Sequence, residues 1–184
     1  MAPAGRNFTV RILPTEDPKD FSYPRLQQGG KKVMFFGAIS KLGKIHFSTL
    51  KAKVDSERFG EFLQNEALPA VKNVHNSSFI LQMDNASPHK GFTSDIIKIE
   101  NIKTLVWPAQ SPDLNPIEQV WLWMALKIGP KIFKDIVELE EYVFSLWEEI
   151  PKNTILAFLE KMTEKLKWVI ESEEELYPDH HKEI

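Results

Sequence analysis

Hydrophobic and polar residues follow two different periods along this chain, and the change of period marks the predicted elements. The apolar run VMFFGAIS (33–40) and the segment IHFSTL (45–50) flank the polar turn KLGK, which predicts a β-hairpin. FTVRIL (8–13) predicts one further strand ahead of it. From Ser56 the apolar positions fall three and four residues apart, which predicts a helix ending near residues 73–76.

Short strands and helices alternate in the middle of the chain. FILQM (79–83) predicts a short buried strand, with Asp84 at its tip. Ser87 and Pro88 predict the start of the next helix, as its N-cap and its first residue. KTLVW (103–107) predicts another strand, which a proline stops.

Helices dominate the C-terminal part of the chain. Asn115 as N-cap and Pro116 as first residue predict the start of one helix, which Gly129 and Pro130 end. Two more helices are predicted at 135–149 and 153–171. Strands that pair early and then alternate with helices indicate an α/β fold, a mixed sheet flanked by helices.

Composition changes this picture in three ways. With 42% hydrophobic and 11% aromatic residues, the chain has the make-up of a globular protein, and we expect one domain over residues 1–171 followed by an acidic, frayed tail at 172–184. The absence of cysteine excludes disulfides and thiolate metal sites. No signal peptide opens the chain and no apolar run reaches membrane-spanning length, so we expect no membrane partner. The net charge of −3 does not by itself indicate a nucleic-acid partner.

Two carboxylates are candidate metal ligands. In mixed sheets flanked by helices, ligands gather at the carboxyl ends of strands, where Asp84 is expected. The helix and strand that follow can return the chain to this place, with Glu118 on the first turn of the next helix. Two converging carboxylates can hold Mg²⁺, which prefers oxygen ligands, and a pair of such ions can promote phosphoryl transfer.

Structural roles are the alternative for the same residues, and spacing alone favours them. Asp84 has the place of a turn-forming acid. Glu118 lies three residues after Asn115, a variant of the capping box that stabilises a helix by about 1 kcal/mol. His89 has the place of a first-turn helix residue, or of a contact to phosphate or to a metal-bound carboxylate.

Two phrases are specific in combination: MDNASPHKG (83–91) and WPAQSPDLNPIEQVW (107–121). Together they resemble the catalytic domain of Tc1/mariner-type transposases, in which a DN-x-x-x-H phrase ends the fourth strand and a WPxxSPDLNPIExxW phrase carries the last acid. The hairpin is similar to that family's V-M-x-W-G-x-I-S-x-x-G strand pair, with Phe36 where Trp is usual. The resemblance covers roughly residues 8–170.

The resemblance implies a ribonuclease H-like fold with a DDE triad and two divalent ions, Mg²⁺ or Mn²⁺. It implies nicking of double-stranded DNA at transposon ends, then attack of a 3′-hydroxyl on target DNA. Asp84 matches the second acid and Glu118 the third, both as catalytic metal ligands, while Asn85, His89 and Asn115 are expected to shape the site. A nuclear location and a possible homo-oligomer follow from the family alone.

The sequence also departs from the family pattern. The family's first acid stands on a strand ahead of the one that matches FTVRIL, and only MAPAGRN precedes that strand here. We therefore expect the first strand, its Asp and the usual N-terminal helix-turn-helix to be missing, with little or no catalysis by this chain. The spacer between Asp84 and Glu118 is one residue shorter than in most Tc1-like members. A non-catalytic module that binds DNA or a protein partner, and a gene-model fragment, stay open as alternatives.

Overall fold

A computed structural model of the chain describes residues 7–8, 33–50, 54–76, 78–84, 86–105, 111 and 114–171. Most of the strand predicted at 8–13, the end of the one at 103–107, and the predicted tail at 172–184 lie outside these residues. The elements are β1 (Asn7–Phe8), β2 (Val33–Ser40), β3 (Gly43–Leu50), α1 (Ser56–Phe62), η1 (Leu63–Ala67), α2 (Leu68–His75), β4 (Ile80–Leu81), η2 (Ser87–His89), α3 (Phe92–Ile99), β5 (Lys103–Thr104), α4 (Pro116–Ile128), α5 (Ile136–Glu149) and α6 (Lys152–Glu171).

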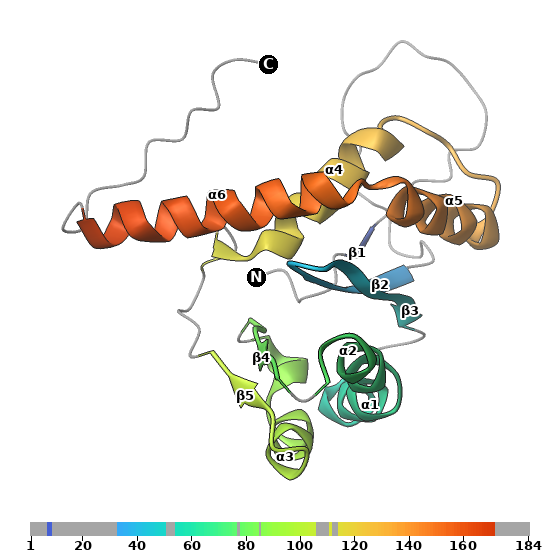
Figure 1. The fold of residues 1–184 in the computed structure, drawn as a ribbon. Helices are drawn as coiled ribbons and strands as arrows, with labels where there is room; N and C mark the ends of the chain where they lie inside the picture. The colour runs from blue at the N-terminus through green and yellow to red at the C-terminus, as the bar shows by residue number, and fades with distance from the viewer. Residues whose placement is uncertain are drawn as a thin grey trace.

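The predicted hairpin of β2 and β3 is confirmed and lies at the centre of the fold. The two strands pair antiparallel, with Phe36 opposite Ser48, and a bulge interrupts the register between Ala38 and Ile39. Helices α1 and α2 lie on one side of the hairpin, and α4, α5 and α6 lie on the other (Figure 1). β1 pairs antiparallel with the start of β2, on the edge away from β3.

Alternate residues of β2 enter two separate hydrophobic cores. Phe35 is buried among residues of α4, α5 and α6. Phe36 is buried among residues of α1, η1 and α3. This alternation follows from the period of two of a strand, which lets one continuous apolar run serve both faces. The hairpin therefore forms the wall between the two cores.

The helix predicted from Ser56 is confirmed, and it contains a wider turn. Asp55 caps α1, since its side chain accepts a hydrogen bond from the Arg58 backbone N–H. η1 is a π-helical segment, in which the N–H of Leu68 bonds the carbonyl of Leu63. Pro69 follows at once, and because proline has no N–H and its ring crowds the preceding turn, the wider turn accommodates it.

The strand predicted at 79–83 is shorter and more exposed than expected. β4 contains only Ile80 and Leu81, and it pairs parallel with β5. Ile80 is 59% exposed, so the prediction of a buried strand is wrong there. Among the described residues no strand pairs with the other edge of β4, which explains both the short pairing and the exposure. Asp84 therefore lies beyond the end of the strand, rather than at its last position.

The helix predicted from Ser87 is divided in two. Ser87 is the first residue of a 3₁₀ turn, η2, and Ala86 rather than Ser87 occupies the N-cap position. Gly91, with a φ of +57°, separates this turn from α3. A positive φ cannot continue a right-handed helix, so the chain changes direction at this glycine before α3 begins.

The three C-terminal helices are confirmed. Asn115 holds the N-cap position of α4, and Gly129, with a φ of +52°, holds its C-cap. Trp121 of α4 and Trp147 of α5 are buried in the core above the hairpin. Within the described residues, no helix combines the length and apolar character needed to cross a membrane.

Candidate functional site

Asp84 lies in the segment that leads from β4 into η2. Its Oδ1 atom accepts a hydrogen bond from the backbone N–H of Ala86 at 3.0 Å. This two-residue spacing is that of an Asx-turn, so the turn-forming role expected of Asp84 is present. The turn fixes one of the two carboxylate oxygens and leaves the other for a different contact.

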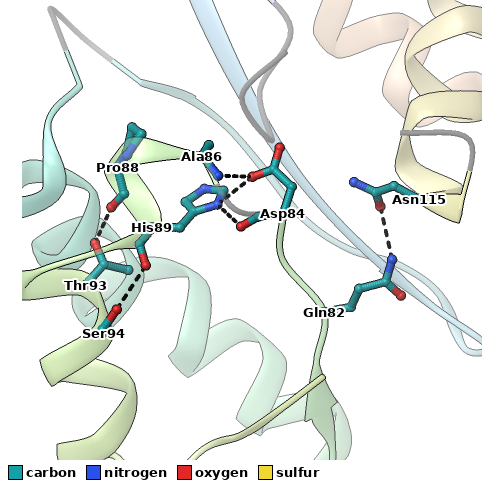
Figure 2. A network of polar contacts seen from close by, with 8 residues as sticks. All are labelled: Gln82, Asp84, Ala86, Pro88, His89, Thr93, Ser94 and Asn115. Carbon is teal, nitrogen blue, oxygen red and sulfur yellow. Dashed lines mark hydrogen bonds and ion pairs between the residues drawn. The ribbon is translucent and has the colours of Figure 1, made fainter. Parts of the chain in front are cut away.

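His89 holds the same carboxylate from the other side of the turn. Its Nδ1 atom lies 2.8 Å from Asp84 Oδ1 and 3.0 Å from the Asp84 carbonyl oxygen (Figure 2). Because both neighbours are acceptors, Nδ1 must carry the proton. The His89 side chain is only 4% exposed, and its imidazole packs on the ring of Phe59, with centroids 4.6 Å apart. His89 thus ends the 3₁₀ turn, rather than lying in the first turn of a helix, and it contacts the Asp84 carboxylate.

The surroundings of Asp84 keep its carboxyl group ionised. Partial burial raises the pKa of Asp84, but the hydrogen bond from His89, the one from Ala86 and the charge of His89 together lower this pKa below its usual value. The second oxygen, Oδ2, points away from both donors (Figure 2). An ionised carboxylate with one fixed oxygen and one turned away from these donors suits a hard cation.

A polar contact joins this segment to the start of α4. The amide nitrogen of Gln82 lies 3.4 Å from Oδ1 of Asn115, at the long end of hydrogen-bonding distance (Figure 2). Asn115 directly precedes α4, and Glu118 lies on the first turn of that helix, partly buried and with partners of its own. The segment bearing Asp84 and the helix bearing Glu118 are therefore neighbours at this point.

The capping role expected of the Asn115 side chain is absent. The backbone N–H of Glu118 donates to the Asn115 carbonyl at 3.0 Å, as in an ordinary helix start. The Asn115 side chain, however, makes no capping hydrogen bond. Its amide oxygen faces Gln82 instead, so the side chain contributes to the contact between the two segments rather than to the helix end.

Asn85, which was expected to shape the site, lies outside the described residues. Over the part of the chain that the structure describes, no cluster of three or more His, Asp or Glu residues could hold a metal ion. Gln82 was missed by the sequence reasoning, although a strand at 79–83 places residues two apart on the same side, which would have linked Gln82 to Asp84.

Comparisons with known proteins found a matching family and several relatives. The family described as DDE superfamily endonuclease matches residues 15–140. The Tc3 transposase of Caenorhabditis elegans is 30% identical over 93% of this chain and 52% of its own length. The Tcb1 transposase of Caenorhabditis briggsae is 25% identical over 91% of this chain and 62% of its own length. The chain thus spans only about half to three fifths of these relatives.

Solved structures with the same fold include several of the Mos1 mariner transposase. The catalytic domain of that protein superposes with a TM-score of 0.69 at 17% identity, over 94% of this chain and 82% of the other. A Mos1 paired-end complex with the left transposon end gives 0.74 at 21% identity, over 91% and 54%. The described residues therefore have the expected ribonuclease H-like fold.

Proposed function

Because the chain belongs to the DDE superfamily endonucleases, as a catalytic domain of the Tc1/mariner transposase type, we propose that Asp84 and Glu118 bind a divalent cation for cutting and joining DNA strands. The observation that carries this proposal is the carboxylate of Asp84. Hydrogen bonds from His89 and Ala86 fix one of its oxygens and favour its ionised form. Such a group is prepared to bind a cation before any ion arrives.

Mg²⁺ or Mn²⁺ fits the chemistry of these donors, which are oxygen atoms of carboxylates. Such an ion, when bound, lowers the pKa of a bound water and offsets the negative charge that grows on a reacting phosphate. The chain's own residues would supply the geometry. His89 orients Asp84, and the contact between Gln82 and Asn115 keeps the first turn of α4, with Glu118, beside the segment that bears Asp84.

Double-stranded DNA is the proposed substrate, as transposon ends and target, and a nuclear location and a homo-oligomer are proposed with it. The Mos1 structures of similar fold are described as complexes with a transposon end and with Mn or Mg, which supports both the DNA and the cation for this chain. The site proposed here has two carboxylates, and the described residues contain no cluster of three or more metal-binding side chains. Two carboxylates hold a divalent ion less firmly than three or more oxygen side chains do, so we expect weak cation binding and slow or absent cleavage from this site by itself.

The cation role is tested by measuring Mn²⁺ binding with electron paramagnetic resonance. Asp84→Asn and Glu118→Gln should each weaken binding at least about 10-fold, because each removes a charged ligand. Asp95→Asn is the matched control, since Asp95 lies on α3 in an exposed pair with Lys98 and should leave binding unchanged. Equal Mn²⁺ affinity in all four proteins would refute the site.

The reaction is tested by nicking of supercoiled plasmid DNA in the presence of Mn²⁺. Nicking that Asp84→Asn and Glu118→Gln abolish would establish the chain as a nuclease. Salt-sensitive DNA binding without any nicking would instead favour the alternative, a non-catalytic DNA-binding module derived from a transposase. A chain that binds neither Mn²⁺ nor DNA would contradict both functions.

A further inference from the structure

Three consecutive backbone carbonyls, those of Pro88 and His89 in η2 and of Lys90 after it, each accept a hydrogen bond from a side-chain hydroxyl. Thr93 Oγ1 lies 2.6 Å from the carbonyl oxygen of Pro88, and Ser94 Oγ lies 3.2 Å from that of His89 (Figure 2). Ser56 Oγ, at the start of α1, donates to the carbonyl oxygen of Lys90. The backbone on either side of the His89 side chain is thus held by hydroxyls from two different helices.

These hydroxyls replace hydrogen bonds that the backbone cannot make here. The turn ends where Gly91 takes a φ of +57°, so the carbonyls just before it have no following helical turn to bond to. A Cβ atom at Gly91 would lie 3.3 Å from Ser56 Oγ, which shows how closely α1 approaches the turn. The hydroxyls give these carbonyls hydrogen-bond partners, two of them in part-buried surroundings.

Ser56 and Thr93 also bond to each other in two ways. The Thr93 backbone N–H donates to Ser56 Oγ at 3.2 Å, and Thr93 Oγ1 lies 2.9 Å from the Ser56 carbonyl oxygen. Thr93 is fully buried. Because its single hydroxyl proton faces both the Pro88 and the Ser56 carbonyls, Thr93 joins the turn to α1 directly.

The same helix contacts the His89 ring. Phe59 lies one turn after Ser56 in α1, and its ring packs against the imidazole of His89. The backbone of the turn and the ring that it carries are therefore both set against α1. Neither can shift without breaking contacts to that helix.

We infer that Ser56, Thr93 and Ser94 are positioning residues. Their hydroxyls hold the turn so that His89 binds one oxygen of Asp84 and the other oxygen stays turned away from His89. The importance of this arrangement for cation binding rests on the proposed function. The hydroxyl contacts and the His89–Asp84 contact do not depend on it. A purely structural role would stabilise the fold without influencing the proton that His89 shares with Asp84.

Nuclear magnetic resonance of the full chain, without metal, separates the two roles. Thr93→Val and Ser56→Ala should each abolish the slowly exchanging His89 Nδ1 proton signal and speed the exchange of the Ala86 amide. Thr93→Ser, which keeps the hydroxyl, should restore both. Thr163→Val and Ser145→Ala are matched controls, because each removes a hydroxyl-to-carbonyl bond within α6 or α5, and both should leave the signals unchanged.

Mn²⁺ affinity provides the second readout. In Thr93→Val the dissociation constant should rise about 3- to 10-fold, less than the roughly 10- to 100-fold typical when a group touching a metal ligand is replaced. If Thr93→Val does not fold, Ser56→Ala at its partly exposed site carries the same test. Folded variants that retain the His89 proton signal and the original Ala86 exchange rate would overturn the inference. A wild-type chain that binds no Mn²⁺ would refute the proposed function instead, since the metal-free spectra decide the positioning role.

Discussion

The imidazole Nδ1 of His89 donates to both the side chain and the main chain of Asp84, at 2.8 Å from Oδ1 and 3.0 Å from the carbonyl oxygen. One N–H group thereby links two atoms that rotation of the Asp84 side chain would otherwise separate. The direction of the carboxylate is fixed by the protein itself. A carboxylate held in this way would be oriented in advance of the cation that we propose it binds.

Replacing His89 should raise the pKa of Asp84. In His89→Ala the partial burial of Asp84, which raises this pKa, persists, while the hydrogen bond and charge of His89, which lower it, are lost. The carboxyl ¹³C signal should therefore titrate at higher pH than in the wild type. His75→Ala, which removes a histidine whose ring contacts Ser40 at 3.0 Å, is the control and should not move the Asp84 titration. An unchanged midpoint in His89→Ala would contradict the prediction.

His46 should make the folded state less stable in mild acid. Its ring packs near Phe36 and Phe62, and burial lowers the pKa of His46 more than the nearby charge of Glu66 raises it. A histidine with a lowered folded-state pKa binds its proton more readily when unfolded. The contribution of neutral His46 to the free energy of unfolding is therefore fully present above its unfolded-state pKa of about 6.5. As the pH drops from there through the lowered folded-state pKa of His46, the free energy of unfolding falls.

Urea unfolding at a series of pH values measures this effect. The free energy of unfolding should decrease between neutral and mildly acidic pH in the wild type. His46→Phe, which keeps an aromatic ring in the same cluster, should show a shallower decrease over that range. Parallel curves for the two proteins would assign the pH dependence to other groups.

Two glycines should respond differently to the same substitution. At Gly37 a Cβ atom would lie 2.9 Å from Trp121 Cη2 and 3.1 Å from Trp147 Cζ3, both in buried rings. Gly37→Ala should therefore destabilise the fold by about 1–3 kcal/mol, as overpacking does. At Gly60 the nearest atom belongs to Phe92, which is 41% exposed and can turn away. Gly60→Ala in α1 should cost less, because alanine favours a helix by about 1 kcal/mol over glycine. Chemical denaturation of both variants tests the difference.

The two N-cap residues that begin α4 and α5 should differ in how much their replacement by alanine destabilises the fold. The Asp135 side chain accepts a hydrogen bond from the Glu138 N–H at 3.0 Å, so Asp135→Ala should destabilise the fold by about 0.5–2 kcal/mol. The Asn115 side chain makes no such bond. Asn115→Ala should therefore destabilise the fold less, and mainly loosen the contact to Gln82. Thermal unfolding gives the comparison, and equal losses at both positions would mean that Asn115 caps its helix in solution.

The sequence predicts the elements of this fold well where the signal is local. The β2–β3 hairpin and the C-terminal helices follow from apolar spacing and from capping residues, and these agree with the structure. The start of the helix predicted from Ser87 is wrong because Gly91 turns the chain ahead of α3, and a glycine alone does not reveal its φ. The length of β4 is wrong because pairing depends on which strands lie beside it, and no periodicity within FILQM reports that.

The residues of the candidate site could likewise be predicted only where they belong to local motifs. Asp84, His89 and Glu118 could be named from their motifs, and the contact of Asp84 with His89 is found. The roles of Gln82, Ser56 and Thr93 were not predicted, since each depends on a contact between segments distant in sequence. Such contacts arise from tertiary packing, which one sequence without its fold does not specify.

The alternation of Phe35 and Phe36 between two cores has a consequence for changes in chain length. Adding or removing one residue within β2 would shift one part of the strand by one position against β3, and the side chains of that part would turn to the opposite face. Rings that belong to one layer of helices would then point at the other layer. An insertion or deletion within this strand would therefore disorganise both layers at once.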